Sequence, residues 1–597
     1  MTLKKMSACG FEKKYKTSTT TKVKALFTEP CVAVWIILFF GDKSPEMATL
    51  EMSISQFFND KTVAITGGTG FIGQCLIVKL LKSCPGVKKI YLFMRNKKSD
   101  SVEERLEKMI KSPIFKAFDR SLLQKLVAIP CDLEKEGFGL DEGNVQLIQD
   151  EVQIFFHSAA TLRFNEHLRL AFQVNTLAVR TVIGLCRGIK NLKALVHIST
   201  AYAYCNQQHI GEEVYETGQD YNKLHESLQW MSDDMITKLT PDILRDRPNT
   251  YTLTKAFGEE VVVNEGAGLP LCIVRPSIVG STYQEPLQGW INNVNGPTGL
   301  FLAVGKGFLC SIWGSGKTFV DIIPSDLVVN GIIAAAWKTA LSNPQTQIPF
   351  LSNNQLKPLT DQVVAERRKM IPIYHLVVGS TNPLPIERLN SMLHKSFMVY
   401  PLDNVIRSPS LQITENKHLY RLLAFVYEYL PAYVFDLGLT MVGRKPMVMR
   451  LNQRIATNVK VLQFFISNQW NWDVTKTMHL MSQLNSSDQQ SFNFDAQTIN
   501  WQTYINRYVI GVKKYLLKED LDSYPAQRRR LKRLHLLGYV GQGVLFLLVW
   551  RLLVSRTNIA RNLWHLVMSL GFKFFQYFQI SSSVPKSNFL RLPLWKS

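Results

Sequence analysis

The stretch KTVAITGGTGFIGQCLIVKLLKSC, residues 61–84, decides the fold of this chain. A β-branched run (KTVAIT) leads into a glycine-rich turn (TGGTGFIG), and an apolar-periodic segment follows, which predicts strand, turn and helix in that order. Three glycines form a GxxGxxG pattern in which the backbone can approach a pyrophosphate, and the start of the helix offers N–H donors to it. The stretch therefore predicts a dinucleotide site formed by Gly67, Gly70, Phe71, Ile72 and Gly73.

The next predicted strand ends on a basic residue. An acidic residue at this place would hold the ribose 2′-hydroxyl of NAD, whereas Arg95, with Lys97 and Lys98 behind it, suits the 2′-phosphate of NADP. The alternative is that these residues are solvated charges of a loop. We therefore expect NADPH rather than NADH as the cofactor.

Further apolar runs follow, separated by helix-like stretches. They are KLVAIPCDL (125–133), VQIFFHSAA (152–160), ALVHISTAYAY (194–204) and LPLCIVRPSIVG (269–280). Near-continuous apolar strands that alternate with helices indicate a parallel sheet covered on both faces. The predicted fold class is α/β, a Rossmann-type doubly wound parallel sheet.

A Tyr–Lys pair and two hydroxyls are the candidate catalytic residues. Tyr251 and Lys255 stand in YTLTK, and this spacing places both on one face of a helix, where the ammonium is expected to lower the pKa of the phenol. A chain with 20 Tyr contains about one such pair by chance, so the pair alone decides nothing. The pair becomes more significant because Ser199 and Thr200 end a predicted strand before it. A hydroxyl at that place could bind a substrate carbonyl oxygen together with Tyr251.

Charge and cysteine usage exclude several classes of function. The 597 residues carry 69 Lys plus Arg against 47 Asp plus Glu, a net charge of +22. Residues 528–597 hold twelve of these basic residues and no acid, whereas the body shows no basic, aromatic-studded groove, which argues against nucleic-acid binding. The nine Cys form neither a CxxC pair nor a zinc spacing, so we expect buried free thiols and no metal site.

Composition divides the chain into four parts. Residues 1–51 form an extension that we expect to be poorly ordered, with a signal peptide as the alternative, because its run CVAVWIILFF is too short to span a bilayer. Residues 52–400 form the predicted nucleotide-binding domain, and 401–520 form a smaller helical domain. The basic, apolar segment 528–580 is expected to contact a membrane, with a pair of core or amphipathic helices as the alternative.

Together these motifs resemble the extended short-chain dehydrogenase/reductase superfamily and, more narrowly, the animal fatty acyl-CoA reductases. The resemblance covers nearly all of residues 52–580, including a helical "sterile" domain and a hydrophobic tail. The segments that carry it most specifically are ISTAYAYCN (198–206), RPSIVGSTYQEPLQGWINNVNGPTG (275–299), VDIIPSDLVVN (320–330), GRKP (443–446), FNFD (492–495) and GVKKYLLKED (511–520).

The resemblance implies an activity and roles for the candidate residues. Two NADPH would reduce a fatty acyl-CoA, C16–C18 by expectation, to a primary fatty alcohol with release of CoA, feeding wax ester and ether lipid synthesis. Tyr251 would protonate the developing alkoxide, Lys255 would hold the nicotinamide ribose, and Thr200, or else Ser199, would bond the carbonyl oxygen. Further cofactor contacts are implied for Arg95 at the 2′-phosphate, Asp132 beside the adenine, Ala159, Ala160, Asn175 and Pro276.

The resemblance also implies a place in the cell. Its members are tail-anchored, which leads us to expect the peroxisomal membrane with the body facing the cytosol, and the endoplasmic reticulum membrane as the alternative. Residues 1–51 and extra residues at about 343–370 have no counterpart in the family, which bears on folding and substrate access. Two other functions stay open: an extended reductase of a sterol or carbonyl lipid, and a non-catalytic membrane-bound lipid-binding paralogue.

Overall fold

The computed structural model describes residues 52–96, 100–342, 361–379 and 381–581. The predictions for residues 1–51, for Lys97 and Lys98, and for most of the extra connection (343–360) therefore lie outside the described residues.

A seven-stranded sheet forms the centre of the fold. In spatial order its strands are β11 (Ile373–Leu376), β7 (Leu271–Pro276), β5 (Ala194–Ile198), β4 (Ile154–His157), β1 (Thr62–Thr66), β2 (Lys89–Met94) and β3 (Leu126–Pro130). All neighbouring strands are parallel. The predicted parallel α/β fold is confirmed.

Successive residues of each strand serve two separate cores. In β1, Val63 and Ile65 belong to one core and Ala64 to the other, as the alternation of side chains across a strand requires. In β4, Phe156 and Phe155 divide in the same way. Because both faces are buried, the strands read as near-continuous apolar runs in the sequence.

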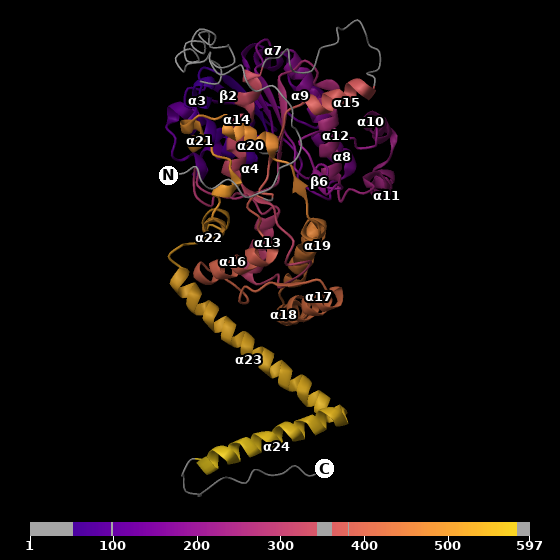
Figure 1. Cartoon of the computed structure of the whole chain (residues 1–597), viewed down its shortest axis with the longest axis vertical. Helices are drawn as coiled ribbons and strands as arrows, with labels where there is room; N and C mark the ends of the chain where they lie inside the picture. The colour runs from indigo at the N-terminus through magenta and orange to yellow at the C-terminus, as the bar shows by residue number, and fades with distance from the viewer. Residues whose placement is uncertain (1–51, 97–99, 343–360, 380, 582–597) are drawn as a thin grey trace, which may run out of the picture. The chain divides into compact units, whose positions relative to one another are not determined.

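Helices cover both faces of the sheet (Figure 1). The first core is closed by α4 (Phe71–Ser83) and α14 (Ser325–Leu341), and the second by α9 (Ala178–Arg187) and α12 (Thr250–Glu265). The other helices before residue 380 are α3 (Ile54–Phe57), α5 (Val102–Ile110), η1 (Pro113–Phe115), α6 (Arg120–Leu123), η2 (Glu136–Gly139), α7 (Glu142–Glu151), α8 (Leu168–Phe172), η3 (Gln173–Leu177), α10 (Tyr221–Trp230), α11 (Asp233–Leu244), α13 (Pro297–Lys306) and α15 (Asp361–Met370).

The chain after residue 385 is mainly helical. Its elements are α16 (Ile386–Val399), α17 (Lys417–Ala424), η5 (Phe425–Tyr429), α18 (Leu430–Met441), α19 (Val448–Ser467), α20 (Thr475–Ser482), α21 (Ser486–Ser491), η6 (Ala496–Thr498), α22 (Trp501–Gly511) and η7 (Val512–Leu516). Three two-stranded ladders stand beside the main sheet: β6 (His209–Ile210) with β13 (Asn471–Trp472), β8 (Ile278–Gly280) with β10 (Ile322–Pro324), and β9 (Ser311–Trp313) with β12 (Gln412–Thr414).

Buried tyrosines of α22 join the helical part to the sheet part. The hydroxyl of Tyr504 donates to Ser281 O at 3.1 Å, and the hydroxyls of Tyr508 and Thr298 share a hydrogen bond of 2.7 Å. All three side chains are buried, so these polar contacts need their partners. These hydrogen bonds therefore fix α22 against the segment 281–298 of the sheet part.

Two long helices end the described chain, α23 (Tyr524–Arg556) and α24 (Asn558–Ser581). Within the described residues, Tyr524–Arg556 and Lys417–Met441 are long and apolar enough to cross a membrane, by length and composition alone. The first overlaps the basic, apolar segment 528–580 that was expected to contact a membrane. The second, made by α17, η5 and α18, was expected to be part of an ordinary helical domain. These apolar helices support association with a membrane.

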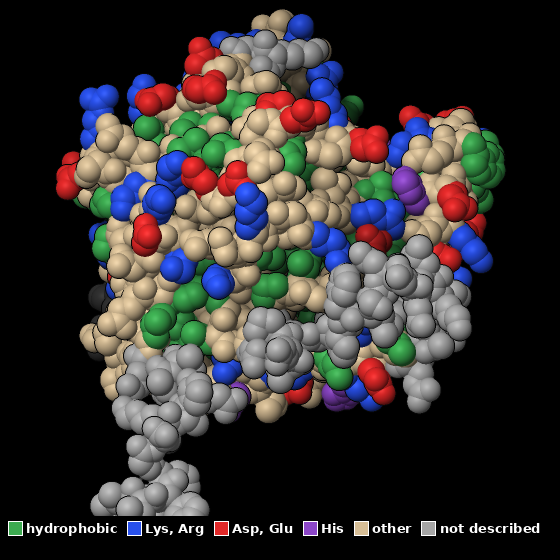
Figure 2. Space-filling model, turned by 90° about the horizontal axis from the view of Figure 1, so that it is seen from above, with side chains coloured by type: hydrophobic (Ala, Val, Ile, Leu, Met, Phe, Trp, Pro, Cys, Tyr) green, Lys and Arg blue, Asp and Glu red, His purple; other side chains and the backbone are tan. Residues whose placement is uncertain are grey.

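Basic and acidic side chains are mixed on one face of the molecule (Figure 2). On the face shown in Figure 2, Lys and Arg are interspersed with Asp and Glu. The seven cysteines among the described residues are free and buried, as predicted, while Cys9 and Cys31 lie outside the described residues.

Candidate active site

The turn between β1 and α4 has room only for glycine at its tightest points. Gly67 has a φ of +74°, and a Cβ there would lie 2.8 Å from the backbone nitrogen of Ala159. A Cβ on Gly73 would lie 2.7 Å from the Cα of Gly68. No side chain caps the start of α4 at Gly70, which leaves its first amides uncovered. Backbone donors without side chains above them fit the pyrophosphate of a dinucleotide.

The position of this turn in the sheet also favours a nucleotide. Strand β1 lies between β2 and β4, which is the point where the strand order reverses. In open α/β sheets, ligands bind at the carboxyl ends of the strands at such a point. The cavity described below opens at this place.

Two arginines and two carboxylates line the cavity beyond β2: Arg95, Arg105, Asp132 and Glu134. Arg95 Nη1 lies 2.7 Å from Glu134 Oε1, with both side chains about half exposed, and Arg105 donates to the backbone oxygen of Arg95. The sequence predicted Arg95 but missed Arg105, which stands ten residues later on α5 without a motif to mark it. A 2′-phosphate at this place would meet both guanidiniums and would compete with Glu134 for Arg95.

Strand β5 and helix α12 bring the candidate catalytic residues together. Ser199 and Thr200 directly follow β5, and Tyr251 and Lys255 lie on the first turns of α12, whose N-cap Asn249 accepts a hydrogen bond from Thr252 N. The side chains of Thr200 and Tyr251 both line the cavity described below. Lys255 is buried and donates from Nζ to Ile198 O at 2.8 Å, so its position relative to β5 is fixed.

The pKa of Tyr251 differs from the expectation. Burial raises it from 10 to about 12, and the Thr200 hydroxyl opposes that rise in part. The ammonium of Lys255, which was expected to lower the pKa of the phenol, is directed at Ile198 O instead. Burial also lowers the pKa of Lys255 to about 8, against the opposing charge of Glu259. At neutral pH the Tyr251 phenol therefore keeps its proton and can donate it.

Two histidines behind Lys255 were missed by the sequence analysis. The rings of His157 and His197 stack with centroids 5.4 Å apart, and His157 Nδ1 lies 2.8 Å from Thr66 Oγ1. Burial, and then the charge of Lys255, lowers the pKa of His157 to about 3, and the pKa of His197 is lowered in the same way. Both imidazole rings are therefore neutral at neutral pH, and neither adds a positive charge beside the Lys255 ammonium. In the sequence, only their positions near the ends of two predicted strands could have indicated that they lie at the site.

One predicted cofactor residue lies outside the cavity wall. Asn175, which is buried, accepts from Thr161 N at 2.9 Å and donates to Thr254 Oγ1 at 3.0 Å, so it joins the loop after β4 to α12. The other predicted site residues all line one cavity: Gly67, Gly70, Phe71, Ile72, Gly73, Arg95, Asp132, Ala159, Ala160, Ser199, Thr200, Tyr251, Lys255 and Pro276.

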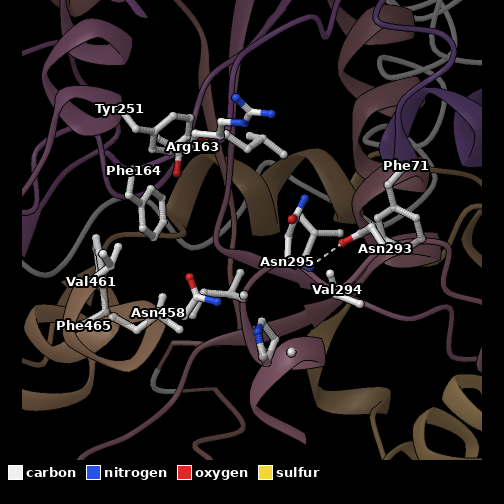
Figure 3. Close-up of a pocket in the computed structure, with 18 of the residues that line it drawn as sticks. Phe71, Arg163, Phe164, Tyr251, Asn293, Val294, Asn295, Asn458, Val461 and Phe465 are labelled. Carbon is white, nitrogen blue, oxygen red and sulfur yellow. Dashed lines mark hydrogen bonds between the residues drawn. The ribbon is translucent and has the colours of Figure 1, made fainter. Parts of the chain in front are cut away.

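That cavity has a volume of 1980 Å³ and continues well past Tyr251. Figure 3 shows Phe164 between Tyr251 and the α19 side chains Phe465 and Val461. The ring centroid of Phe164 lies 5.6 Å from that of Tyr251 and 5.4 Å from that of Phe465. Beyond these rings the wall is mainly apolar and is formed by Leu300, Phe301, Ile312, Leu389, Leu393, Leu451, Ile455 and Leu462. The cavity therefore joins a polar nucleotide-sized end to an apolar end.

The described residues contain no group of three or more His, Cys, Asp or Glu that could hold a metal ion.

Comparisons with known proteins agree with this architecture. Two family models described as "male sterility protein" match the chain, an NAD-binding model at residues 65–332 and a Sterile model at residues 427–519. Fatty acyl-CoA reductase 1 of Homo sapiens is 39% identical over 539 residues, which cover 89% of this chain and 99% of the relative. Fatty acyl-CoA reductase 2 of Mus musculus is 37% identical over 534 residues, with the same coverage.

Among solved structures, the terminal R domain of the myxalamid PKS-NRPS biosynthetic pathway is similar to this chain. It is 15% identical, covers 76% of this chain and 91% of its own length, and has a TM-score of 0.48.

Proposed function

Since this chain belongs to the fatty acyl-CoA reductase family and is an oxidoreductase by that membership, we propose that it uses NADPH to reduce long-chain fatty acyl-CoA to a primary fatty alcohol and CoA. The observation that carries the proposal is the continuous cavity. It starts at the glycine turn, passes Thr200 and Tyr251, and continues among apolar side chains between α13 and α19. The glycine turn suits a nucleotide, the hydroxyls of Thr200 and Tyr251 suit a thioester carbonyl, and the apolar side chains suit an acyl chain.

The proposed chemistry uses three side chains. The cofactor, when bound, supplies the hydride that adds to the thioester carbonyl carbon. Thr200 and Tyr251 hold the carbonyl oxygen, and the protonated phenol of Tyr251 gives its proton to the oxyanion as charge develops there. Lys255 uses one N–H on Ile198 O and keeps two for a ribose hydroxyl.

The product of this first step is a hemithioacetal. It loses CoA thiol as its C–S bond breaks and becomes an aldehyde. In a second round the aldehyde oxygen takes the place of the thioester oxygen between Thr200 and Tyr251. Another hydride and another proton then give the primary alcohol, so two reduced cofactors are used for each CoA released.

The apolar end of the cavity supports a long acyl chain as substrate. Burial of each CH₂ contributes about 0.8 kcal/mol, and this end is lined mainly by Leu, Ile and Phe side chains. A chain of C16–C18 would gain far more from this surface than a short one. The apolar wall also favours retention of the intermediate aldehyde between the two reductions.

The preference for NADPH is supported by Arg95 and Arg105 at the end of the cavity beyond β2. Two guanidiniums suit a phosphate better than a ribose hydroxyl. Asp132 follows β3, next to the end of β2, and we expect it to lie beside the adenine of a nucleotide on the glycine turn.

We propose a separate role for each of three consecutive parts of the chain. Residues 52–400 bind the cofactor and the thioester, 401–520 complete the acyl-chain end, and 528–580 contact the membrane. The apolar α23 and its basic residues support a tail anchor, which we place in the peroxisomal membrane with the body in the cytosol, where the alcohol would feed ether lipid and wax ester synthesis. The endoplasmic reticulum is the alternative membrane.

The proposal is tested with the full chain in detergent, palmitoyl-CoA and NADPH, with the lipid products separated and CoA release measured. We expect hexadecanol and a ratio of two NADPH to one CoA. Accumulated hexadecanal at a ratio of one would mean a one-step reductase. No turnover of any acyl-CoA by folded, NADPH-binding protein would refute the function and favour a non-catalytic lipid-binding protein.

A further inference from the structure

An exposed apolar surface lies on α17, η5, α18 and the loop to Met447, which we call the α17–α18 face (residues 417–447). Several of its large side chains are more than half exposed, with fractions of 56% for Phe425, 60% for Tyr433, 59% for Phe435, 77% for Met441 and 70% for Val442. Soluble proteins rarely leave such a contiguous set of apolar side chains in water, and larger patches mark interaction sites.

The charges on and beside this face are positive. From residue 416 to 472 the chain has seven exposed basic residues, Lys417, Arg421, Arg444, Lys445, Arg450, Arg454 and Lys460. The same segment has two acids, Glu428 and Asp436. This differs from the interspersed charges of the face in Figure 2. An apolar surface surrounded by Lys and Arg has the composition of helices that lie on anionic lipid.

Both acids are used to hold the face in shape. Glu428 Oε1 accepts from the backbone nitrogens of Cys310 and Ser311 at 2.9 and 3.0 Å. Asp436 accepts from the backbone nitrogens of Met447, Val448 and Met449 at 3.0, 3.0 and 2.8 Å, which closes the loop that carries Arg444 and Lys445. The seven basic residues outnumber these two carboxylates by five, so the segment keeps a net positive charge.

These anchors also decide between lying on a membrane and crossing it. Asn452 Nδ2 donates to Glu428 O at 2.8 Å, and Arg407 Nη1 donates to Tyr427 O at 2.9 Å, so the middle of this helical stretch is tied to the body on several sides. Crossing a bilayer would break these bonds and expose both carboxylates to hydrocarbon. A helix pair fixed on one side and apolar on the other suits the interface, where such helices sink about 5–10 Å.

The face adjoins the apolar end of the cavity. Helix α19 begins at Val448, directly after the loop of the face (Figure 1). It lines the cavity from Leu451 to Phe465, and Figure 3 shows its side chains Asn458, Val461 and Phe465 there. The fourteen residue-to-residue steps from Leu451 to Phe465 span about 21 Å of helix. One leaflet of a bilayer has about 15 Å of hydrocarbon, so the path is long enough for the acyl chain of a membrane lipid.

We propose that the α17–α18 face is a membrane-docking surface that rests in the headgroup layer of an anionic bilayer, separate from α23. Docking brings the exposed start of α19, with Leu451 and Arg454, to the lipid surface. An acyl chain then passes between bilayer and cavity without crossing water. This last step rests on the proposed function, whereas docking itself does not.

The first test measures contact with lipid directly on the full chain. A fluorescent amino acid replaces Phe435 in one variant, Leu547 of α23 in a second and Trp230 of α10 in a third; each native side chain is more than half exposed. The variants are reconstituted into vesicles of phosphatidylcholine and phosphatidylserine that carry brominated acyl chains. We expect quenching at positions 435 and 547 and none at 230.

Two results would overturn the proposal. One is quenching at 547 without quenching at 435. The other is emission at 435 that changes with protein concentration in the absence of lipid, because a second copy of the chain would then cover the face.

A second test addresses the basic residues. In Arg444→Gln/Lys445→Gln the equilibrium for docking should fall by about 30-fold on phosphatidylserine vesicles, read as lost quenching at position 435. The control Lys223→Gln/Lys238→Gln removes two exposed charges from α10 and α11 and should leave quenching unchanged. Equal quenching at position 435 in the two double variants would refute the role of Arg444 and Lys445 in docking. Quenching at 435 in a chain that reduces no acyl-CoA would refute the proposed function but not docking.

Discussion

The substitution Gly73→Ala tests whether the turn after β1 holds the cofactor. The new Cβ would stand 2.7 Å from Gly68 Cα and closer still to Gly67 O, both of them backbone atoms. Carbon atoms in contact prefer about 3.5–4.0 Å, so the turn or α4 must move by about 1 Å. A displacement of that size at a site of this kind costs about 100-fold, or about 2.8 kcal/mol. We expect the dissociation constant of NADPH to rise by about that factor.

The matched control is Gly184→Ala on α9, where the new Cβ would have no described atom within 4 Å apart from its two chain neighbours and the adjoining backbone of its own helix. That change should leave NADPH binding unaltered and stabilise the helix by about 1 kcal/mol. The assay is titration of each purified protein with NADPH by calorimetry, with thermal unfolding to confirm that both fold. If Gly73→Ala bound NADPH as tightly as Gly184→Ala, the cofactor would not rest on this turn.

Three further predictions concern the other side chains of the site. Tyr251→Phe should lower kcat by about 10²–10⁴-fold with NADPH affinity unchanged, because it removes only the proton donor; equal kcat would reject that role. Burial lowers the pKa of Lys255 to about 8 in the folded protein, from 10.5 in the unfolded chain. The free-energy cost of burying its ammonium is therefore present in full below pH 8 and disappears as the pH rises to 10.5. Relative to Lys255→Met, the wild-type free energy of unfolding should therefore rise across that window by on the order of 3 kcal/mol, measured by denaturant titration; a constant difference would contradict it. Arg95→Ala should raise KM for NADPH about tenfold and leave KM for NADH unchanged, since a charge-assisted bond to phosphate is worth about 1.5 kcal/mol; equal effects on both cofactors would exclude a phosphate contact.

The local parts of the site were predictable from sequence because local geometry demands them. The glycine turn needs residues without Cβ atoms at Gly67 and Gly73, and the helical spacing of Tyr251 and Lys255 follows from α12 alone. Apolar runs buried on both faces marked the parallel strands in the same way. Each of these signals lies within one element or one turn.

The remaining parts depend on contacts between distant segments. Phe164 and the α19 side chain Phe465 carry no motif, and the fold alone brings them beside Tyr251. The pKa of Tyr251 was expected to fall because its neighbour is a lysine, but burial dominates and the ammonium bonds to Ile198 O. The sequence predicted only that 417–441 belongs to a smaller helical domain, and the structure shows that many of its apolar side chains are left exposed.

The most direct test of the central claim follows the hydride into the product. The full chain is supplied with palmitoyl-CoA and NADPH deuterated at both C4 positions, and the alcohol is analysed by mass spectrometry. If both reductions take place at the cavity beside Tyr251, hexadecanol should carry two deuterium atoms on C1, and the Tyr251→Phe protein should form almost none. Hexadecanol with fewer than two deuterium atoms on C1, or unchanged product from Tyr251→Phe, would contradict it.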